Sequence, residues 1–139
     1  MAFEHPIPAT EAVRVRMSRQ PSRDTLPELA LRRELHRRGL RFRVHRRPIA
    51  GLRREADIVF GPARVAVFVM GCFWHGCPEH ATWPRNNAAW WRDKLEKNRA
   101  RDIDTANRLS EAGWTAVVVW EHESPRRAAA RIERMVRRR

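Results

Sequence analysis

The sequence lacks any apolar run approaching the roughly 20 residues that a membrane-spanning helix needs. Its first residues, MAFEHPIPATEA, lack the basic segment and the apolar segment that together mark a secretory signal. Only two of the 139 residues are cysteine, and no internal repeat or low-complexity linker divides the chain. The absence of apolar segments predicts a soluble cytoplasmic protein without membrane contact. In such a protein, two cysteines are expected to bind a metal or to remain free thiols rather than to form a structural disulfide.

Acidic residues are also few relative to basic ones. Lys and Arg number 29 against 16 Asp and Glu, which gives a net charge of +13. The chain is still 42% hydrophobic and holds six tryptophans, so it is too apolar for a disordered basic tail. We therefore expect one packed domain over 17–139, preceded by a flexible arm over 1–16, and a polyanionic partner, most simply nucleic acid.

Hydrophobic periodicity and capping signals predict the secondary structure. Thr25 and Glu28 have capping-box spacing, and Gly39 and Gly113 are suited to ending helices. The elements expected are a helix over 26–38, strands over 40–44, 56–60 and 65–69, a helix from 86 or 87 to 112, a strand over 114–120, and a helix from Ser124-Pro125. This order predicts an α/β fold with a mixed sheet and helices on both sides.

The apolar positions of the helices are expected to face the core. They are Leu26, Leu29, Leu31 and Leu35 in the first helix, Trp90, Trp91, Leu95, Ile103, Ala106 and Leu109 in the second, and Ala128, Ile132, Met135 and Val136 in the third.

Two thiols and two imidazoles could form one metal site. Cys72, Cys77 and His80 lie close together in the sequence, and His122 follows the last expected strand. Two thiolates and two imidazoles complete a tetrahedral structural zinc site. A short-loop disulfide, or histidines that merely lie on the surface, would explain the same residues.

A second set of residues suits a nuclease. Asp57 lies near the outer end of an expected strand beside a basic loop, where its carboxylate could hold Mg²⁺, while His75 could deprotonate water and Glu28 could act through water. Structural alternatives remain for each: Asp57 could pair with Arg53 or Arg54, Glu28 could only close the capping box, and His75 could be a zinc ligand.

The adjacent Phe73 and Trp74 lie in an irregular segment among polar residues. Aromatic side chains of this kind can insert between base pairs. They can equally pack beneath the loop as a small satellite core.

The motif GCFWHGCP at 71–78 resembles that of the very short patch repair (Vsr) endonucleases, which are DNA mismatch endonucleases with the PD-(D/E)XK nuclease fold. The resemblance extends from about Met17 to His122. It includes Arg23-Asp24-Thr25 with Glu28, GLRFRV at 39–44, ADIV at 56–59, Lys97-Asn98 with Arg101-Asp102, and Gly113-Trp114 before 119–121. It implies a restriction-endonuclease-like mixed sheet flanked by helices, with a structural zinc site.

The resemblance also implies roles for individual residues. Asp57 would be a direct Mg²⁺ ligand and the backbone carbonyl of Val69 a second one. His75 would be the catalytic histidine, oriented by Asp102, and Glu28 would act through water.

Further roles implied are zinc binding and DNA recognition. The zinc ligands would be Cys72, Cys77, His80 and His122. Residues that wedge into the base stack would be Met17, Phe73 and Trp74, and those that read the mismatched pair would be Lys94 and Asn98, which share one helical face.

Three departures from the expected patterns matter: the missing (D/E)XK tripeptide, the residue at position 70, and an arm before Met17 that is this chain's own. The usual (D/E)XK tripeptide is absent, as in this family, where the histidine replaces the lysine. Position 70, usually His or Asp, is Met70, whose thioether is a poor Mg²⁺ ligand.

The function implied is Mg²⁺-dependent nicking of one DNA strand next to a T:G mismatch, by a monomer, at the nucleoid when DNA is bound and with mismatch-repair proteins as further partners. Two alternatives remain: a mismatch-binding or DNA-structure-binding protein weakened in cleavage by Met70, and a nuclease of other specificity linked to restriction or defence.

Overall fold

The computed structural model describes residues 23–71 and 88–138. Within these ranges the elements follow the predicted order, helix, three strands, helix, strand, helix. They are α2 (Leu26–Arg37), β1 (Arg43–Arg46), β2 (Ala56–Phe60), β3 (Val65–Met70), α4 (Ala88–Glu111), β4 (Thr115–Trp120) and α5 (Pro125–Arg137). The predicted arm over 1–16 lies outside the described residues, so the proposed domain boundary stays a prediction. No described helix is long and apolar enough to cross a bilayer.

Four expected helix ends are confirmed, whereas the expected start of α4 at 86 or 87 lies outside the described residues. Thr25 caps α2 in a complete capping box with Glu28, and Ser124 caps α5. Gly39 and Gly113 adopt φ of +79° and +82°, a conformation that glycine reaches at little cost.

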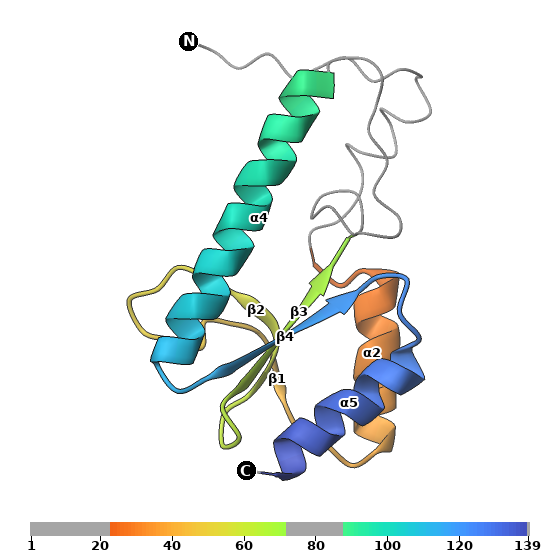
Figure 1. Ribbon diagram of the computed structural model, residues 1–139. Coiled ribbons are helices and arrows are strands. Elements are labelled where there is room, and N and C mark those ends of the chain that lie inside the picture. Colours follow the sequence, from red (N-terminus) through yellow and green to blue (C-terminus); the bar gives the residue numbers. More distant parts are fainter. Residues whose placement is uncertain (1–22, 72–87, 139) are drawn as a thin grey trace.

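The four strands form one mixed sheet in the order β1-β2-β3-β4 (Figure 1). β1 pairs with β2, and β2 with β3, in antiparallel orientation, whereas β3 and β4 are parallel, with Val65 beside Thr115 and Met70 beside Trp120. Because β3 and β4 are parallel, their carboxyl ends lie side by side at the same end of the sheet.

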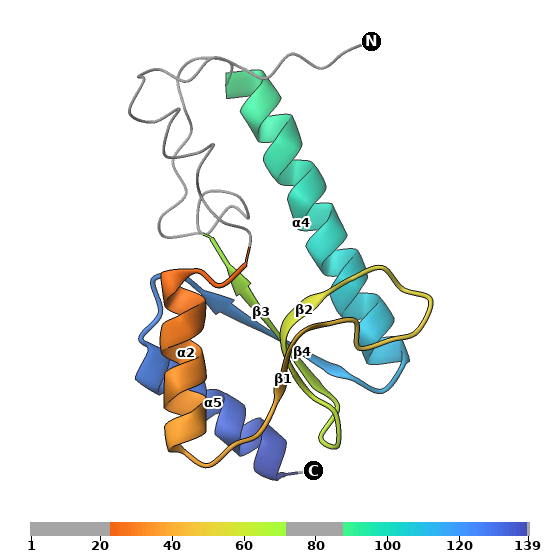
Figure 2. The same cartoon turned by 180° about the vertical axis from the view of Figure 1, so that it is seen from behind.

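Helices cover both faces of the sheet, as predicted: α2 and α5 lie on one side and α4 on the other (Figures 1 and 2). Alternate strand residues divide between two buried clusters. The larger cluster joins the sheet to α2 and α5 and contains Leu31, Leu35, Ile58, Phe60, Val65, Val67, Val117, Val119, Ala128 and Ile132. The smaller cluster joins Val59 and Ala66 to Leu109 of α4.

β4 forms one edge of the sheet in the described part of the chain. Arg131 of α5 reaches over this edge, where its Nη2 donates to the Val118 carbonyl at 2.9 Å. Glu123 holds the same guanidinium at 3.1 Å.

The prediction of a strand over 40–44 is wrong at its start. The Leu40 N–H donates to the Leu35 carbonyl, and the Gly39 N–H donates to the His36 carbonyl. These two bonds form a Schellman motif, in which the residue after the glycine packs back on the helix. Leu40 therefore belongs to the end of α2, and β1 begins at Arg43.

Two apolar residues predicted to face the core are exposed. Leu26 is 82% exposed, since it occupies the first position of α2 on its outer side. Ile103 is 63% exposed. It lies eight residues after Leu95, roughly 80° around the helix from the buried line of α4 at 100° per residue.

Candidate active site

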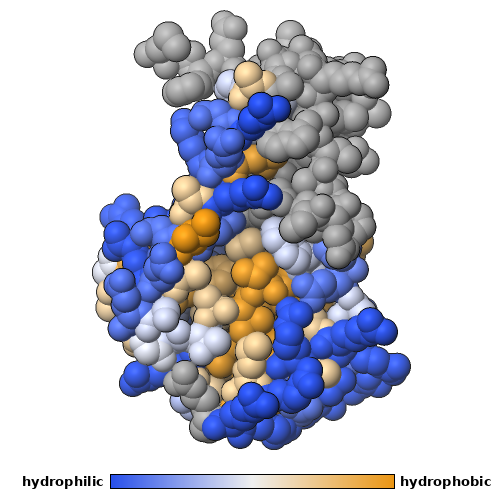
Figure 3. Space-filling model, in the orientation of Figure 1, coloured by the Kyte–Doolittle hydropathy of each residue, from blue (hydrophilic) through white to orange (hydrophobic). Residues whose placement is uncertain are grey.

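A pocket of about 370 Å³ lies where β2 begins and β3 ends, facing the middle of α4. The residues lining it are Arg54, Glu55, Asp57, Phe68, Val69, Met70, Asn98, Arg101, Asp102 and Thr105. Seen from the side of Figure 3, apolar residues gather over the sheet between hydrophilic surfaces above and below. The pocket thus joins predicted site residues from β2, β3 and α4, which are far apart in the sequence.

Asp57 lies at a point where β2 and β3 part. The last residue pair between these strands in this direction is Ile58 with Val67, and beyond it the Val69 N–H donates to Asp57 Oδ2 at 2.7 Å. The N–H and carbonyl of one strand residue point to the same edge, so the Val69 carbonyl also faces β2. The hydrogen bond that the described residues give Asp57 uses Oδ2, which leaves Oδ1 for another group.

The environment of Asp57 disfavours its charge. Burial raises the pKa of this carboxyl from 3.8 to about 6, against the opposing effect of the Val69 N–H. The charges of Glu28 and Glu55 raise the pKa further, whereas that of His45 lowers it. A half-buried carboxylate near two others gains stability from a nearby cation, because the cation offsets both burial and repulsion.

Glu28 is buried and does more than close the capping box. Its Oε2 accepts from the Thr25 N–H at 3.3 Å, while its Oε1 accepts from Arg32 Nη2 at 3.0 Å. Asp24, Glu28 and His45 bring potential metal-ligand atoms within 4.8 Å of one another. Arg32 already lies among them, with Nη2 also 2.7 Å from Asp24 Oδ1, so a guanidinium supplies the positive charge there.

The opposite wall of the pocket comes from α4. Asn98, Arg101, Asp102 and Thr105 line it at three- and four-residue spacing, as one helical face does. Lys94, one turn before Asn98, is exposed and is not among the lining residues.

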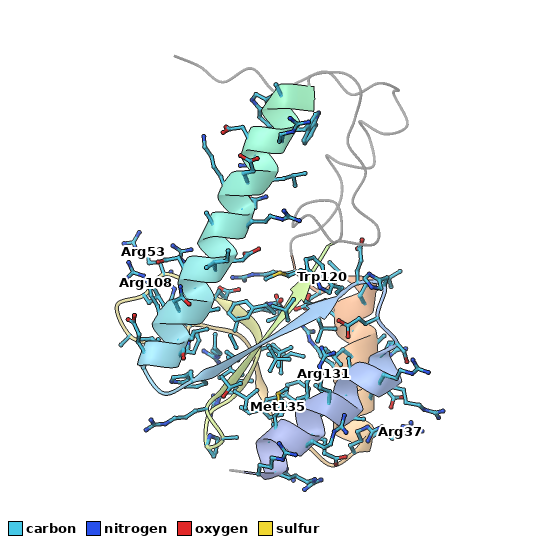
Figure 4. All side chains as sticks on the ribbon, viewed as in Figure 1. Arg37, Arg53, Arg108, Trp120, Arg131 and Met135 are labelled. Carbon is cyan, nitrogen blue, oxygen red and sulfur yellow. The ribbon has the colours of Figure 1, made fainter. Side chains whose placement is uncertain are left out.

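A loop before β2 is tied to α4 beside the pocket. Arg54 donates to Thr105 Oγ1 at 3.3 Å and to Asp104 Oδ2 at 3.4 Å. Figure 4 shows Arg53 of this loop and Arg108 of α4 on the left of the view, beside the lower part of α4. The alternative that Asp57 pairs with Arg53 or Arg54 is therefore wrong. Arg54 donates to two side chains of α4, and Asp57 accepts a hydrogen bond from the Val69 N–H.

Sequence reasoning missed five residues in and around this site. Arg54, Glu55, Arg101 and Thr105 line the pocket, and His45 lies behind it. The helical spacing from Asn98 and Asp102 could have indicated Arg101 and Thr105. No pattern in the sequence marks His45 as a site residue, because only the fold brings β1 beside α2 and the start of β2.

Other predicted site residues fall outside the described ranges: Met17, Cys72, Phe73, Trp74, His75, Cys77 and His80. Among the predicted zinc ligands, His122 is described and is exposed just after β4. The Glu121 N–H donates to the Met70 carbonyl, which places His122 at the same end of the sheet as Gly71.

Comparisons with known proteins identify a family and several relatives of the chain. The family model described as DNA mismatch endonuclease Vsr matches residues 9–80. The type II nicking enzyme V.NaeI of Lentzea aerocolonigenes is 43% identical over 110 residues, covering 78% of this chain and 66% of that protein. V.XorIIP of Xanthomonas oryzae pv. oryzae, also a type II nicking enzyme, is 42% identical over 115 residues, covering 81% and 82%. The DNA mismatch endonuclease Vsr of Escherichia coli is 36% identical over 104 residues, covering 72% and 63%.

Carboxylates suited to a cation lie in this pocket beside arginines suited to phosphate. The similar proteins are named as type II nicking enzymes and as a DNA mismatch endonuclease. The fold, the site and these relatives define a DNA endonuclease. The chain belongs to the Vsr family of DNA mismatch endonucleases.

Proposed function

We propose that the protein nicks one strand of duplex DNA next to a T:G mismatch in a reaction that depends on Mg²⁺. The observation that carries the proposal is the pocket in which Asp57 and Val69 face Asn98 and Asp102. Membership of the Vsr family supports DNA as the substrate, and the name of the Escherichia coli relative supports a mismatch as the target.

The donor set of the pocket fits Mg²⁺. Asp57 offers a carboxylate oxygen that no described residue occupies, and the Val69 carbonyl faces the same edge. Mg²⁺ prefers such hard oxygen ligands, and the raised pKa of Asp57 falls when a cation lies beside it. When bound, Mg²⁺ supplies positive charge that neutralises the scissile phosphate.

The remaining residues would bind the phosphodiester and move protons. Arg101 lines the pocket with a guanidinium that can bind a phosphate oxygen. By resemblance to the family, His75 takes a proton from the attacking water, and Asp102 orients its imidazole. Water adds to phosphorus and the sugar 3′ oxygen leaves, which gives 5′-phosphate and 3′-hydroxyl ends.

We infer that Phe73 and Trp74, with Met17, wedge into the base stack beside the mismatch. Lys94 and Asn98 would read the mismatched pair. In support, Asn98 lines the pocket and Lys94 lies one helical turn away on the same face.

We also infer a structural zinc held by Cys72, Cys77, His80 and His122. Its support is the residue types together with the position of His122 at the same end of the sheet as Gly71. Metal analysis of the purified protein should give about one zinc per chain, and chelation should lower its thermal stability. A Cys72–Cys77 disulfide without zinc would overturn this assignment.

A binding protein with weakened cleavage is the second candidate, and Met70 favours it. Met70 is 8% exposed and lines the pocket beside Val69, where its thioether offers no hard oxygen.

Single-turnover nicking in Mg²⁺ separates the candidates. Two duplexes would differ only in one T:G pair, and the control enzyme would be Asp57→Asn, which keeps an acceptor for the Val69 N–H. Nicking of the mismatched duplex that is lost in Asp57→Asn supports the proposal. Binding without nicking, together with nicking gained by Met70→Asp, supports the second candidate. Rapid cutting of the matched duplex would contradict both and indicate a different specificity.

A further inference from the structure

His45 has an unusual backbone conformation for a strand residue. Its φ is +51°, although β1 keeps one register on both sides of it, with Val44 beside Ile58 and Arg46 beside Ala56. This register puts His45 opposite Asp57. A non-glycine residue rarely adopts this conformation, and such residues persist where the surrounding structure holds them, often next to functional sites.

Three carboxylates from separate segments surround the His45 ring, whose side chain is 13% exposed. Its Nε2 lies 3.0 Å from Arg32 Nη2, 3.1 Å from Asp24 Oδ1 and 3.6 Å from Glu28 Oε1, and the same guanidinium binds Glu28. On its other side, the buried Nδ1 has no hydrogen-bond partner among the described residues, and the nearest carboxylate to it, Glu55 Oε1, lies 3.6 Å away. The imidazole thus stands between α2 and the residue just before β2.

Two of the carboxylates near His45 are close to the pocket that contains Asp57. Glu55 lines it two residues before Asp57, and the charges of Glu28 and Glu55 both act on Asp57. His45 itself is not among the lining residues. It contacts the carboxylates beside Asp57 from behind, on the side away from α4.

We propose that His45 is a positioning residue that holds Glu28 and Glu55 beside Asp57 and thereby sets how tightly the pocket binds a divalent cation. This inference rests on the proposed function, in which Asp57 holds the cation. Residues that orient metal ligands without touching the metal commonly change metal affinity by about 10- to 100-fold when they are replaced.

The test uses the full chain and measures Mg²⁺ binding by calorimetry without DNA. His45→Asn is the informative variant, because asparagine tolerates positive φ but is too short to reach carboxylates on both sides. It should weaken Mg²⁺ binding by about 10- to 100-fold while leaving DNA affinity without cation unchanged. His45→Gln, which is longer and carries a donor and an acceptor, should recover part of the loss.

His36→Gln is the matched control. The His36 ring stacks on the Phe42 ring, with 4.5 Å between the ring centroids, and contacts none of these carboxylates. It should leave Mg²⁺ binding unchanged. Unfolding curves of all variants show whether each is folded when binding is measured.

Two results would overturn the inference: Mg²⁺ binding of His45→Asn equal to that of the wild type, or a loss no larger than its unfolded fraction explains. Asp57→Asn in the same calorimetry separates this failure from failure of the proposed function. If Asp57→Asn abolishes Mg²⁺ binding and His45→Asn does not alter it, only the role of His45 is wrong. If Asp57→Asn binds Mg²⁺ like the wild type, the proposed cation site is wrong.

Discussion

Replacing Asp57 by asparagine should make the metal-free protein more stable at neutral pH while removing its nicking activity. Burial raises the pKa of Asp57 from 3.8 to about 6, so ionised Asp57 destabilises the folded state. At 1.36 kcal/mol per unit, the difference sets an upper limit of about 3 kcal/mol. The asparagine NH₂ needs a partner of its own, at a cost of about 1 kcal/mol or more, so we expect a net gain of about 1–2 kcal/mol.

The pH dependence identifies the cause. Because the folded-state pKa of Asp57 is raised, the folded wild type binds more protons than the unfolded chain between about pH 4 and pH 6. The contribution of Asp57 to stability therefore falls as pH rises through this window, and Asp57→Asn lacks this fall. The advantage of the variant should be absent near pH 4 and complete above about pH 6.

Urea unfolding in buffer without divalent cations, at several pH values across this window, measures the effect. Asp93→Asn is the control, because Asp93 is exposed and pairs with Lys97 at 3.1 Å on the helix surface, so its replacement should change stability by less than about 0.5 kcal/mol. An Asp57→Asn protein less stable than the wild type at pH 8, or an advantage that does not vary with pH, would refute the reasoning.

Three further predictions concern the core, a helix cap and DNA binding. Ile132→Ala should lower the free energy of unfolding by about 2–5 kcal/mol in urea, because Ile132 is fully buried, whereas Leu26→Ala at an 82% exposed position should change it by less than about 0.5 kcal/mol. Thr25→Ala removes the capping box of α2 and should cost about 1 kcal/mol in the same assay, and an unchanged midpoint would contradict the role of the cap. DNA affinity should fall linearly with salt on logarithmic axes, with a slope of roughly −0.9 per phosphate neutralised, and a flat response would reject charge-driven binding.

Local signals predicted most of the fold. The capping box at Thr25, the strands over 56–60 and 65–69 and the helix start at Ser124 each depend on neighbours within a few residues, and each is confirmed. The start of β1 was mispredicted because Leu40 alternates with Phe42 like a strand residue but bonds back to the helix. Periodicity cannot separate these cases, since both place an apolar residue against the core.

The site was less accessible to sequence reasoning. Asn98 and Asp102 came from family resemblance alone, whereas Asp57 was also indicated by its place near the end of an expected strand, and all three line one pocket. Neither the parting of β2 and β3 nor the contact between His45 and Glu55 leaves a pattern in the sequence. Both depend on which strands become neighbours, which only the tertiary structure decides.

The guanidinium of Arg131 at the edge of β4 bears on how the protein behaves at high concentration. An open strand edge offers unpaired carbonyls and N–H groups to strands of other molecules, and Val118 adds an apolar side chain that is 37% exposed there. Arg131 occupies the Val118 carbonyl and puts a positive charge in the path of an incoming strand. In the described part of the chain, a single side chain of α5 thus occupies one of the carbonyls through which a strand of another molecule would pair with this edge.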